Sequence, residues 1–302
     1  MRTAYLGTSE FAATVLRRLA DTVHRPLLVV TPPDRPKGRG RRTQPSPAAE
    51  VAAELEIDLL QTANVNEEAA LERIRAARPE ALVVCAFGQL IREPLLSAFP
   101  ILNVHPSLLP RWRGAAPIER AIMAGDNRTG VCIMRLTEGL DSGPVALREE
   151  VPLGCDEDFQ ALSERLADIG GELLVKALDL QAAGALEFTA QEEAGVTYAE
   201  KIDPAERRLD PSRPATELAA TVRALTPHVG AYLETTGDER LGVRKARAVD
   251  VSVKTGAVKS EWGALLIGCC RGALRLDEVQ PPGGKPMPVA AYLRGHPLPK
   301  LP

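Results

Sequence analysis

The sequence is poor in aromatic residues and contains no long apolar run. Aromatic residues make up 4% of the 302-residue chain, so we expect hydrophobic cores built mainly from Ala, Leu and Val. No stretch of about 18 consecutive apolar residues exists, which excludes an ordinary transmembrane helix. We therefore expect a cytoplasmic protein that does not bind a membrane. As a separate expectation, we take the protein to be a monomer.

Two cofactor-binding patterns are also missing. The five cysteines include no C-x-x-C pair, and an odd count without that spacing disfavours both a disulfide framework and a zinc site. We expect no metal, and we interpret the cysteines as small buried apolar residues. No G-x-G-x-x-G follows the first predicted strand, which excludes a nicotinamide cofactor.

Charge is divided unevenly along the chain. The overall net charge of -3 combines a net charge of -8 over residues 1–205 with a net charge of +5 over residues 206–302. A basic C-terminal part on an acidic body suggests an anionic partner that is bound mainly by the C-terminal part. Nucleic acid is one such partner, although the signal is weaker than in strongly basic nucleic-acid binders.

Buried strands and helices alternate over the first part of the chain and predict an α/β domain. Continuous apolar runs at 26–30 and 81–86 are typical of buried parallel strands, and a long helix is expected over 162–182. We also expect Asn66 to cap a helix over 66–77, and His24 to lie at the surface. The predicted fold is a Rossmann-like, mostly parallel sheet with helices on both faces.

The last third of the chain predicts a different architecture. After residue 206 come short alternating runs separated by turn residues, which indicate a small β-barrel. These runs are 231–234, 241–248, 264–267 and 273–279. The expected division is therefore a catalytic domain over 1–188, a linker over 189–206 and a barrel domain over 207–302.

Polar residues gather where one predicted buried strand ends. Asn103 and His105 are two positions apart in Asn-Val-His-Pro-Ser-Leu-Leu-Pro, so an extended strand directs both side chains to one face. With Asp141 they offer an amide donor, a titratable ring and a carboxylate, as acyl transfer through a tetrahedral intermediate requires. Taken singly, each has a simpler interpretation: a structural histidine, and turn-forming Asn and Asp.

The joint pattern carries more weight than its single residues. Residues 103–110 are followed by Arg-Trp-Arg-Gly-Ala-Ala-Pro-Ile at 111–118 and by Gly-Leu-Asp-Ser-Gly at 139–143. This resembles the folate-dependent formyltransferases, in particular their tRNA-acting members, over nearly the whole chain. The resemblance implies transfer of the formyl group of 10-formyltetrahydrofolate to the methionine amine of initiator tRNA. Asn103 and His105 would stabilise the oxyanion, and Asp141 would orient His105 and help to accept the amine proton.

The resemblance also implies two substrate sites. The residues implied to bind folate are Phe87, Gly88, Gln89, Leu90, Ser107, Leu108, Leu109, Pro110, Glu138 and Gly139. A plain strand-to-helix connection is the alternative for the 87–91 loop. Those implied to line the methionine pocket are Gly7, Thr8, Ser9 and Phe11, with core packing as the alternative for Phe11.

A basic loop over 32–47 is the candidate RNA contact in the first domain. Its prolines and glycines disfavour a helix, so we expect an exposed, mobile loop. The resemblance implies that this loop grips the acceptor stem, with Lys201 close to the RNA end and an oligonucleotide-binding-type (OB-like) barrel behind it. The implied contacts are Arg35, Lys37, Arg39, Arg41, Arg42 and Lys201. A solvated surface, and a solvated linker lysine at 201, are the alternatives.

Two departures from the family pattern leave other functions open. Pro106 replaces a common Gly or Ala, and residues 226–230 replace an aromatic Pro-Trp-Pro segment. The nearest alternative is a formyltransferase acting on a small amine, such as an amino sugar nucleotide or glycinamide ribonucleotide. A more distant one is a non-catalytic RNA-binding protein.

Overall fold

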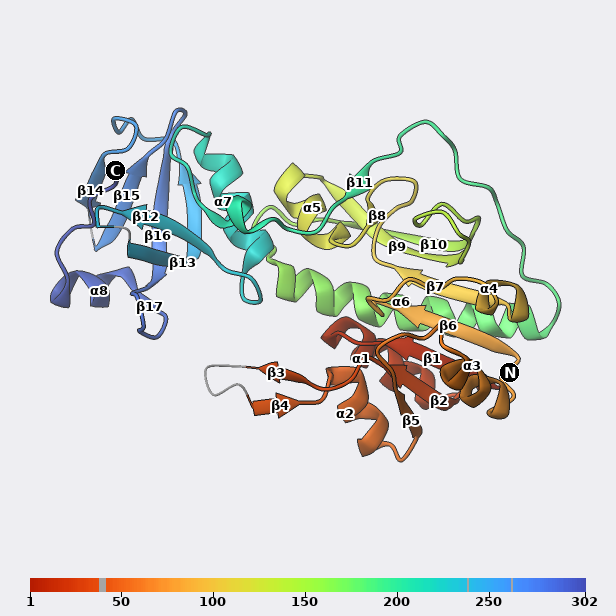
Figure 1. Ribbon diagram of the computed structural model, residues 1–302. Coiled ribbons are helices and arrows are strands. Elements are labelled where there is room, and N and C mark those ends of the chain that lie inside the picture. The colour runs from red at the N-terminus through yellow and green to blue at the C-terminus, as the bar shows by residue number, and fades with distance from the viewer. Residues whose placement is uncertain (38–41, 238, 262) are drawn as a thin grey trace. The chain divides into compact units, whose positions relative to one another are not determined.

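The chain forms two compact units, and each unit has its own sheet. The computed structural model describes residues 1–37, 42–237, 239–261 and 263–302. Unit 1 consists of residues 1–117, 128–151 and 163–199, and unit 2 of residues 118–127, 152–162 and 200–302. A mostly parallel α/β sheet followed by a domain of antiparallel strands confirms the predicted fold class (Figure 1). The expected boundaries at 188 and 207 remain predictions.

A seven-stranded sheet organises unit 1. The strand order is β10-β9-β7-β6-β1-β2-β5, and the pairs from β7 to β5 are parallel. The strands are β1 Thr3–Gly7, β2 Pro26–Thr31, β5 Asp58–Gln61, β6 Ala81–Cys85, β7 Ile101–His105, β9 Arg128–Arg135 and β10 Val145–Pro152. The central strands β1, β6 and β7 are buried along their whole length, as expected where helices cover both faces.

Helices cover both faces of this sheet. On one face, apolar residues of β1 and β6 form a core with residues of α3 and α4. On the other face the Tyr5 hydroxyl donates to the carbonyl of Ala12 in α1, and α6 lies along β7 and β9, because Gly170 faces Val104 and Val131 (Figure 1). The helices of unit 1 are α1 Glu10–Ala20, α2 Pro47–Glu54, α3 Glu68–Ala76, α4 Leu95–Ala98 and, from residue 163 on, α6 Phe159–Ala182. Helix α5 Pro117–Ala124 belongs to unit 2 from residue 118 on.

Strand β9 runs antiparallel to β7, and this reversal sets the position of the loop that follows it. Leu102 pairs with Arg135 and His105 with Cys132, so the end of β9 lies beside the first half of β7. The chain between β9 and β10 therefore starts close to Asn103. That loop carries Asp141.

Unit 2 is built on a six-stranded antiparallel sheet with the order β12-β13-β16-β15-β14, and β17 pairs with β16. Its core contains the apolar face of α7 and residues of the short helix α8. The elements are α7 Ala215–Leu225, β12 Ala231–Thr235, β13 Glu239–Val249, β14 Val258–Glu261, β15 Ala264–Gly268, β16 Ala273–Gln280, β17 Met287–Pro288 and α8 Val289–Gly295. The sequence did not predict β14, β17 or α8.

The 32–47 segment contains regular structure where an irregular loop was expected. Strands β3 Arg35–Lys37 and β4 Arg42–Gln44 pair antiparallel, with Pro36 opposite Thr43. A two-stranded ribbon has only outer edges, where a proline without an N–H group is tolerated. The residues described at 33–36 and 43–45 are exposed, as predicted.

Two single-residue predictions are wrong. Helix α3 begins at Glu68, and Asn66 does not cap it; the Asn66 side chain donates to the carbonyl of Leu90 and accepts from the backbone N–H of Arg92. His24 is 2% exposed and its Nε2 lies 2.8 Å from Asp179 of α6. In both cases a partner distant in sequence outweighs the local preference.

Within the described residues, no helix combines the length and the hydropathy that a membrane span requires.

The cysteines are only partly buried, which corrects the sequence interpretation. Cys85, Cys132 and Cys269 are buried, whereas Cys155 and Cys270 are exposed. Burial raises the pKa of the Cys85 thiol to about 12 and that of Cys132 to about 11, and it also raises the pKa of Cys269. The thiolate is the reactive species, so the buried thiols are unreactive in the folded protein.

We therefore expect two of the five thiols to react with an aromatic disulfide reagent in the native protein at about pH 8, and all five after denaturation. Replacement of both Cys155 and Cys270 by serine should abolish the native reaction. Rapid modification of a third thiol in the folded double variant would contradict the assigned burial.

Candidate active site

Asn103 and His105 lie on one face of β7. Both side chains are buried, with 7% and 4% of the residue exposed, and both point away from α6, since Val104 between them faces Gly170. Alternation along an extended strand produces this arrangement, as the two-residue spacing predicted.

Asp141 approaches the same face from the turn after β9. Its carboxylate lies 3.4 Å from Asn103 Nδ2 and 3.6 Å from His105 Nδ1, and it accepts a hydrogen bond from the Gly114 backbone N–H at 2.8 Å. Gly114 belongs to the short strand β8 Arg113–Gly114. The structure thus brings together three side chains that are separated by up to 38 residues.

The contacts of His105 define its ring orientation. Its Nε2 lies 2.9 Å from the backbone carbonyl of Trp112, and a carbonyl can only accept, so Nε2 carries a hydrogen. Nδ1 then faces the Asp141 carboxylate. A doubly protonated ring offers a donor at each nitrogen and matches both neighbours.

The contacts among the three side chains are long. Both 3.4 Å and 3.6 Å exceed the usual length of a hydrogen bond between charged partners. Asn103 Nδ2 and His105 Nδ1 both face the Asp141 carboxylate at these long distances, so a reacting oxygen or amine beside the cluster can make shorter bonds to them. An amide donor, an imidazole and a carboxylate suit proton transfer coupled to stabilisation of an oxyanion.

The turn that carries Asp141 is held by close backbone packing. Asp141 has φ = +43°, and a Cβ added to Gly143 would lie 1.9 Å from the Arg135 carbonyl oxygen. The Arg135 N–H donates to the Pro144 carbonyl at 3.0 Å, which fixes the turn against β9.

The residues implied to bind folate include both buried supports and exposed positions. Phe87, Ser107 and Leu109 are buried, and the Ser107 hydroxyl donates to the Arg111 carbonyl. Gln89 ties the loop to its neighbours, because Oε1 accepts from Val65 N–H and Nε2 donates to the Thr62 carbonyl. By contrast, the exposed members can meet a ligand; they are Gly88, Leu90, Glu138 and Gly139.

Two further members of that set lie between these extremes. Leu108 is half-buried, and its Cδ2 would lie 2.6 Å from a Cβ added at Gly130 in β9. Pro110 is half-buried and follows it in the chain. A Cβ added to Gly88, at φ = +78°, would meet nothing within 4 Å, so the backbone there is open.

The turn after β1, implied to face the acceptor, has structural contacts of its own. The Thr8 hydroxyl donates to the Phe87 carbonyl, and the Ser9 hydroxyl caps α1 by accepting from the Ala12 N–H. A Cβ on Gly7 would lie 3.1 Å from the Cys85 carbonyl. Phe11 is 7% exposed and packs toward Gly170 of α6, as a core residue does.

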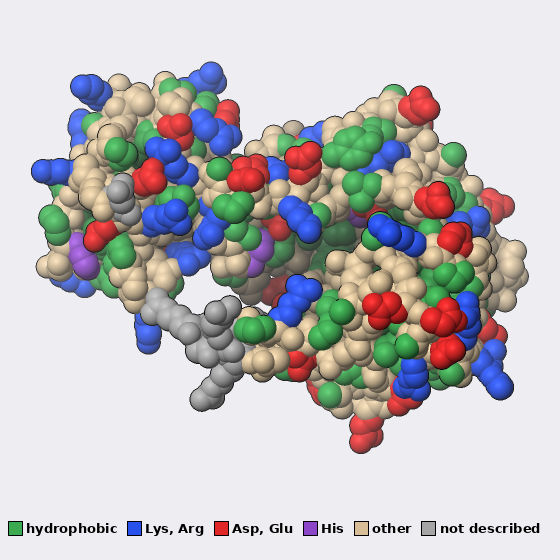
Figure 2. All heavy atoms as spheres, in the orientation of Figure 1, with side chains coloured by type: hydrophobic (Ala, Val, Ile, Leu, Met, Phe, Trp, Pro, Cys, Tyr) green, Lys and Arg blue, Asp and Glu red, His purple; other side chains and the backbone are tan. Residues whose placement is uncertain are grey.

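The basic residues implied to contact RNA divide between the two units. Arg35 in unit 1 and Lys201 in unit 2 are exposed. The predicted contacts Arg39 and Arg41 lie outside the described residues. Lys37 is the last residue of β3, and Arg42 is the first residue of β4. On the face drawn in Figure 2, Lys and Arg side chains are spread over unit 2, whose residues 206–302 carry a net charge of +5.

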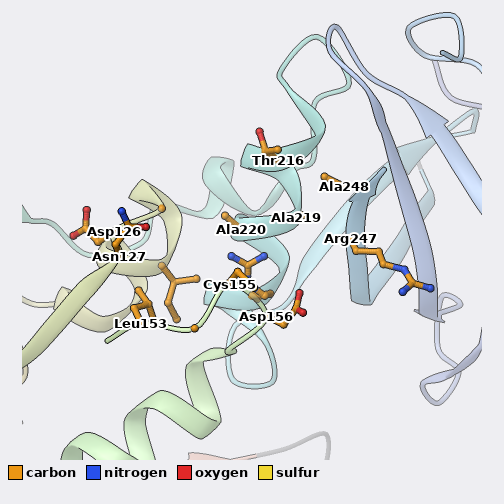
Figure 3. A pocket seen from close by; sticks show the side chains of 14 residues that line it. Asp126, Asn127, Leu153, Cys155, Asp156, Thr216, Ala219, Ala220, Arg247 and Ala248 are labelled. Carbon is orange, nitrogen blue, oxygen red and sulfur yellow. The ribbon is translucent and has the colours of Figure 1, made fainter. Parts of the chain in front are cut away.

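Unit 2 contains a separate cavity of about 370 Å³ (Figure 3). Arg223 of α7 lines it together with Asp126, Asp156 and Arg247, so both signs of charge are present. Burial lowers the pKa of the Arg223 guanidinium, and the nearby Asp156 carboxylate partly offsets this effect. The mixture of charges favours no single class of ligand.

Several residues around the cluster were not identified from the sequence. Trp112 contributes a backbone carbonyl to His105, and Gly114 contributes a backbone N–H to Asp141. Gln191 and Thr197 bond to the backbone on either side of the cluster. Such contacts leave no residue-type pattern in the sequence. Gly114 is the exception, because its φ is +124° and a Cβ added there would lie 2.7 Å from the Ala199 carbonyl oxygen, so the position requires glycine.

Two family models match most of the chain. The model described as formyl transferase matches residues 1–178, and the one described as the formyl transferase C-terminal domain matches residues 201–297. A methionyl-tRNA formyltransferase of Methylobacillus flagellatus is 43% identical over 301 residues, covering 99% of this chain and 97% of the relative. A methionyl-tRNA formyltransferase of Pseudomonas paraeruginosa is 41% identical and covers 96% and 94%.

Solved structures share the fold at lower identity. An N-formyltransferase from Helicobacter canadensis, crystallised with folinic acid and dTDP-3-aminofucose, matches with a TM-score of 0.68 and 14% identity over 91% of this chain and 97% of that one. HypX from Aquifex aeolicus, in complex with tetrahydrofolic acid, matches with a TM-score of 0.65 and 19% identity over 97% of this chain and 47% of that one.

The packing of the Asp141 turn yields a stability prediction. Gly143→Ala should lower the free energy of unfolding by about 1–3 kcal/mol, because the added methyl group meets a backbone oxygen that cannot move without breaking the β9 contact. Gly295→Ala is the control, since a Cβ there has no neighbour within 4 Å. Equal denaturation midpoints for the two variants would contradict the packing described.

Proposed function

The chain belongs to the formyl transferase family, and from that premise we propose that it transfers the formyl group of 10-formyltetrahydrofolate to the α-amino group of methionine on initiator tRNA. The observation that carries this proposal is the convergence of Asn103, His105 and Asp141 on one face of β7. Similarity to methionyl-tRNA formyltransferases over nearly the full length of both chains supports the choice of acceptor.

The folate co-substrate supplies an activated formyl group. The exposed apolar side chain of Leu90, 60% accessible, and the open backbone at Gly88 fit a flat ring laid against the 87–90 loop. Glu138 and Gly139 lie near Asp141 in the chain, so a ligand in contact with them would place its formyl carbon near the cluster. Positioning of two substrates can itself supply much of the acceleration.

The three side chains have distinct roles in the transfer. The methionine amine attacks the formyl carbon, and the carbonyl oxygen gains the electron pair and becomes an oxyanion. Asn103 Nδ2 donates a hydrogen bond to that oxygen, and a protonated His105 adds positive charge beside it. Asp141 orients the His105 ring and accepts the proton that the attacking amine releases. When the carbonyl reforms, the carbon–nitrogen bond to folate breaks and the departing nitrogen takes up the proton that Asp141 accepted, which restores the carboxylate.

The anionic acceptor requires positive charge away from the partly buried carboxylate. The 32–47 segment and residues 206–302 provide it, and the proposed RNA contacts are Arg35, Lys37, Arg39, Arg41, Arg42 and Lys201. Each phosphate contact contributes a salt-dependent share of affinity. We also propose that the protein acts as a cytoplasmic monomer, since two soluble substrates and a single-chain cluster require neither a membrane nor a second subunit.

The decisive experiment measures transfer of labelled formyl from the folate donor to charged initiator tRNA. Elongator methionyl-tRNA, glycinamide ribonucleotide and an amino sugar nucleotide serve as competing acceptors. We expect initiator methionyl-tRNA to be formylated far faster than any of the others. Preferred transfer to a small amine would establish the alternative function, and folate binding without transfer to any acceptor would indicate a non-catalytic protein.

Asn103→Ala, His105→Ala and Asp141→Ala should each reduce kcat by about 100-fold or more, because each removes a group that acts on the transition state. Steady-state kinetics with both substrates, together with circular dichroism, measure this. His296→Ala, an exposed histidine stacked on Tyr292 in unit 2, is the matched control and should retain activity. Near-normal turnover by a folded His105→Ala enzyme would show that His105 is not a catalytic residue and would contradict the proposed active site.

Arg39→Ala and Lys201→Ala should weaken tRNA binding and each reduce the slope of log affinity against log salt by about 1, with little change in kcat at saturating tRNA. Arg17→Ala is the control, because Arg17 is paired with Glu54 on the surface of unit 1. Binding measured at several salt concentrations tests the assignment. Slopes equal to that of the wild-type protein would exclude these two side chains as phosphate contacts.

A further inference from the structure

The chain segment 189–199, called here the strap, passes along both sides of the active-site cluster. It leaves α6, pairs with β10 through Thr189 and Val145, and ends as strand β11 Tyr198–Ala199, which is parallel to β8. All of these contacts lie within unit 1.

Gln191 of the strap holds the turn that carries Asp141. Its Nε2 donates to the Asp141 carbonyl at 2.8 Å and to the Gly143 carbonyl at 2.7 Å. Its Oε1 accepts from Nε and Nη2 of Arg113 at 3.0 and 2.8 Å. The amide therefore uses both of its hydrogens and both acceptor positions, and it links the Asp141 turn to β8.

Thr197 holds the opposite side. Its hydroxyl accepts from the backbone N–H of Trp112 at 2.9 Å, and the Trp112 carbonyl accepts from His105 Nε2 at 2.9 Å. The strap thus reaches His105 through the main chain of Trp112 and bonds directly to the main chain of Asp141. Gln191 and Thr197 thus act on the main chains of Asp141 and Trp112.

The two residues held in this way share an unusual backbone conformation. Trp112 has φ = +63° and Asp141 has φ = +43°, and among the described residues only five that are not glycine have positive φ. A side chain disfavours this region, so the conformation persists only where surrounding contacts impose it. In each of the two residues a strap side chain bonds to the main chain at that position.

We propose that Gln191 and Thr197 are positioning residues for the formyl transfer proposed above. They hold Asp141 and Trp112 in the left-handed conformation. The Asp141 carboxylate then faces His105 Nδ1, and the Trp112 carbonyl faces His105 Nε2. Loss of either contact lets the backbone relax and turns the imidazole or the carboxylate away from the reacting atoms. The inference rests on the proposed function for its kinetic test and on the geometry alone for its spectroscopic test.

The kinetic test compares Gln191→Met and Thr197→Val with variants matched in chemistry. Gln181→Met and Thr129→Val are the controls, because the buried Gln181 Oε1 and Thr129 Oγ1 have no hydrogen-bond partner among the described residues of unit 1. We expect Gln191→Met and Thr197→Val to lower kcat by about 10- to 100-fold, with KM for both substrates nearly unchanged. Thr197→Ser, which keeps the acceptor oxygen, should restore most of the activity, and the controls should match the wild-type protein.

Three outcomes overturn the proposal. They are wild-type kcat in a folded Gln191→Met or Thr197→Val protein, equal losses in Thr197→Ser and Thr197→Val, and losses in the controls as large as those in the strap variants. If Gln191→Met fails to fold, the Thr197 pair decides, because serine and valine differ in the one bond at issue.

Ring nitrogen spectra of protein labelled with ¹⁵N-histidine separate this proposal from the proposed function. The His105 signals are assigned by their loss in His105→Gln. If the wild-type protein formylates no acceptor, the proposed function fails, and these spectra alone decide the positioning role. Altered His105 signals in the strap variants, with unchanged signals in the controls, support it; unchanged signals in all variants overturn it.

Discussion

The Asp141 carboxylate is the constraint on which the rest of the site depends. Its side chain is 13% exposed, and a carboxylate removed from water is costly unless hydrogen bonds and positive charge replace the lost solvent. The Gly114 N–H and the amide of Asn103 provide the hydrogen bonds, and His105 can provide the charge. The same groups that make burial of the carboxylate tolerable also define the point at which an acyl group can react.

The fold reaches this arrangement through one reversal of strand direction. Because β9 runs antiparallel to β7, its last residue, Arg135, pairs with Leu102, and the turn that follows begins beside the first half of β7, where the Leu136 N–H donates to the Ile101 carbonyl. The turn must then place a non-glycine residue at positive φ. Left-handed conformations cost about 1–2 kcal/mol for such residues. The cost arises at Trp112, whose carbonyl accepts from His105 Nε2, and at Asp141, whose carboxylate faces His105 Nδ1, and surrounding hydrogen bonds offset it.

Much of the fold and part of the site could be predicted because they depend on local rules. Two-residue alternation places Asn103 and His105 on one face, and apolar runs separated by turns identify the buried strands. The contacts of Trp112 and Gln191 could not be predicted, since a backbone carbonyl has no signature in the sequence and Gln191 lies 50 residues from Asp141. The wrong prediction for Asn66 has the same origin, because its partners come from a loop that is 24 residues away or more.

Charge separation completes the argument for an anionic acceptor. A partly buried carboxylate at the reaction centre repels phosphate, so a polyanionic substrate must be held by positive charge elsewhere while only its uncharged amine enters the cluster. The distribution along the chain meets this requirement, with basic side chains concentrated in the 32–47 segment and after residue 206. Binding and chemistry therefore depend on different residues. Salt should weaken the first through screening at the exposed arginines and lysines, and should leave the second, buried among short-range contacts, largely unchanged.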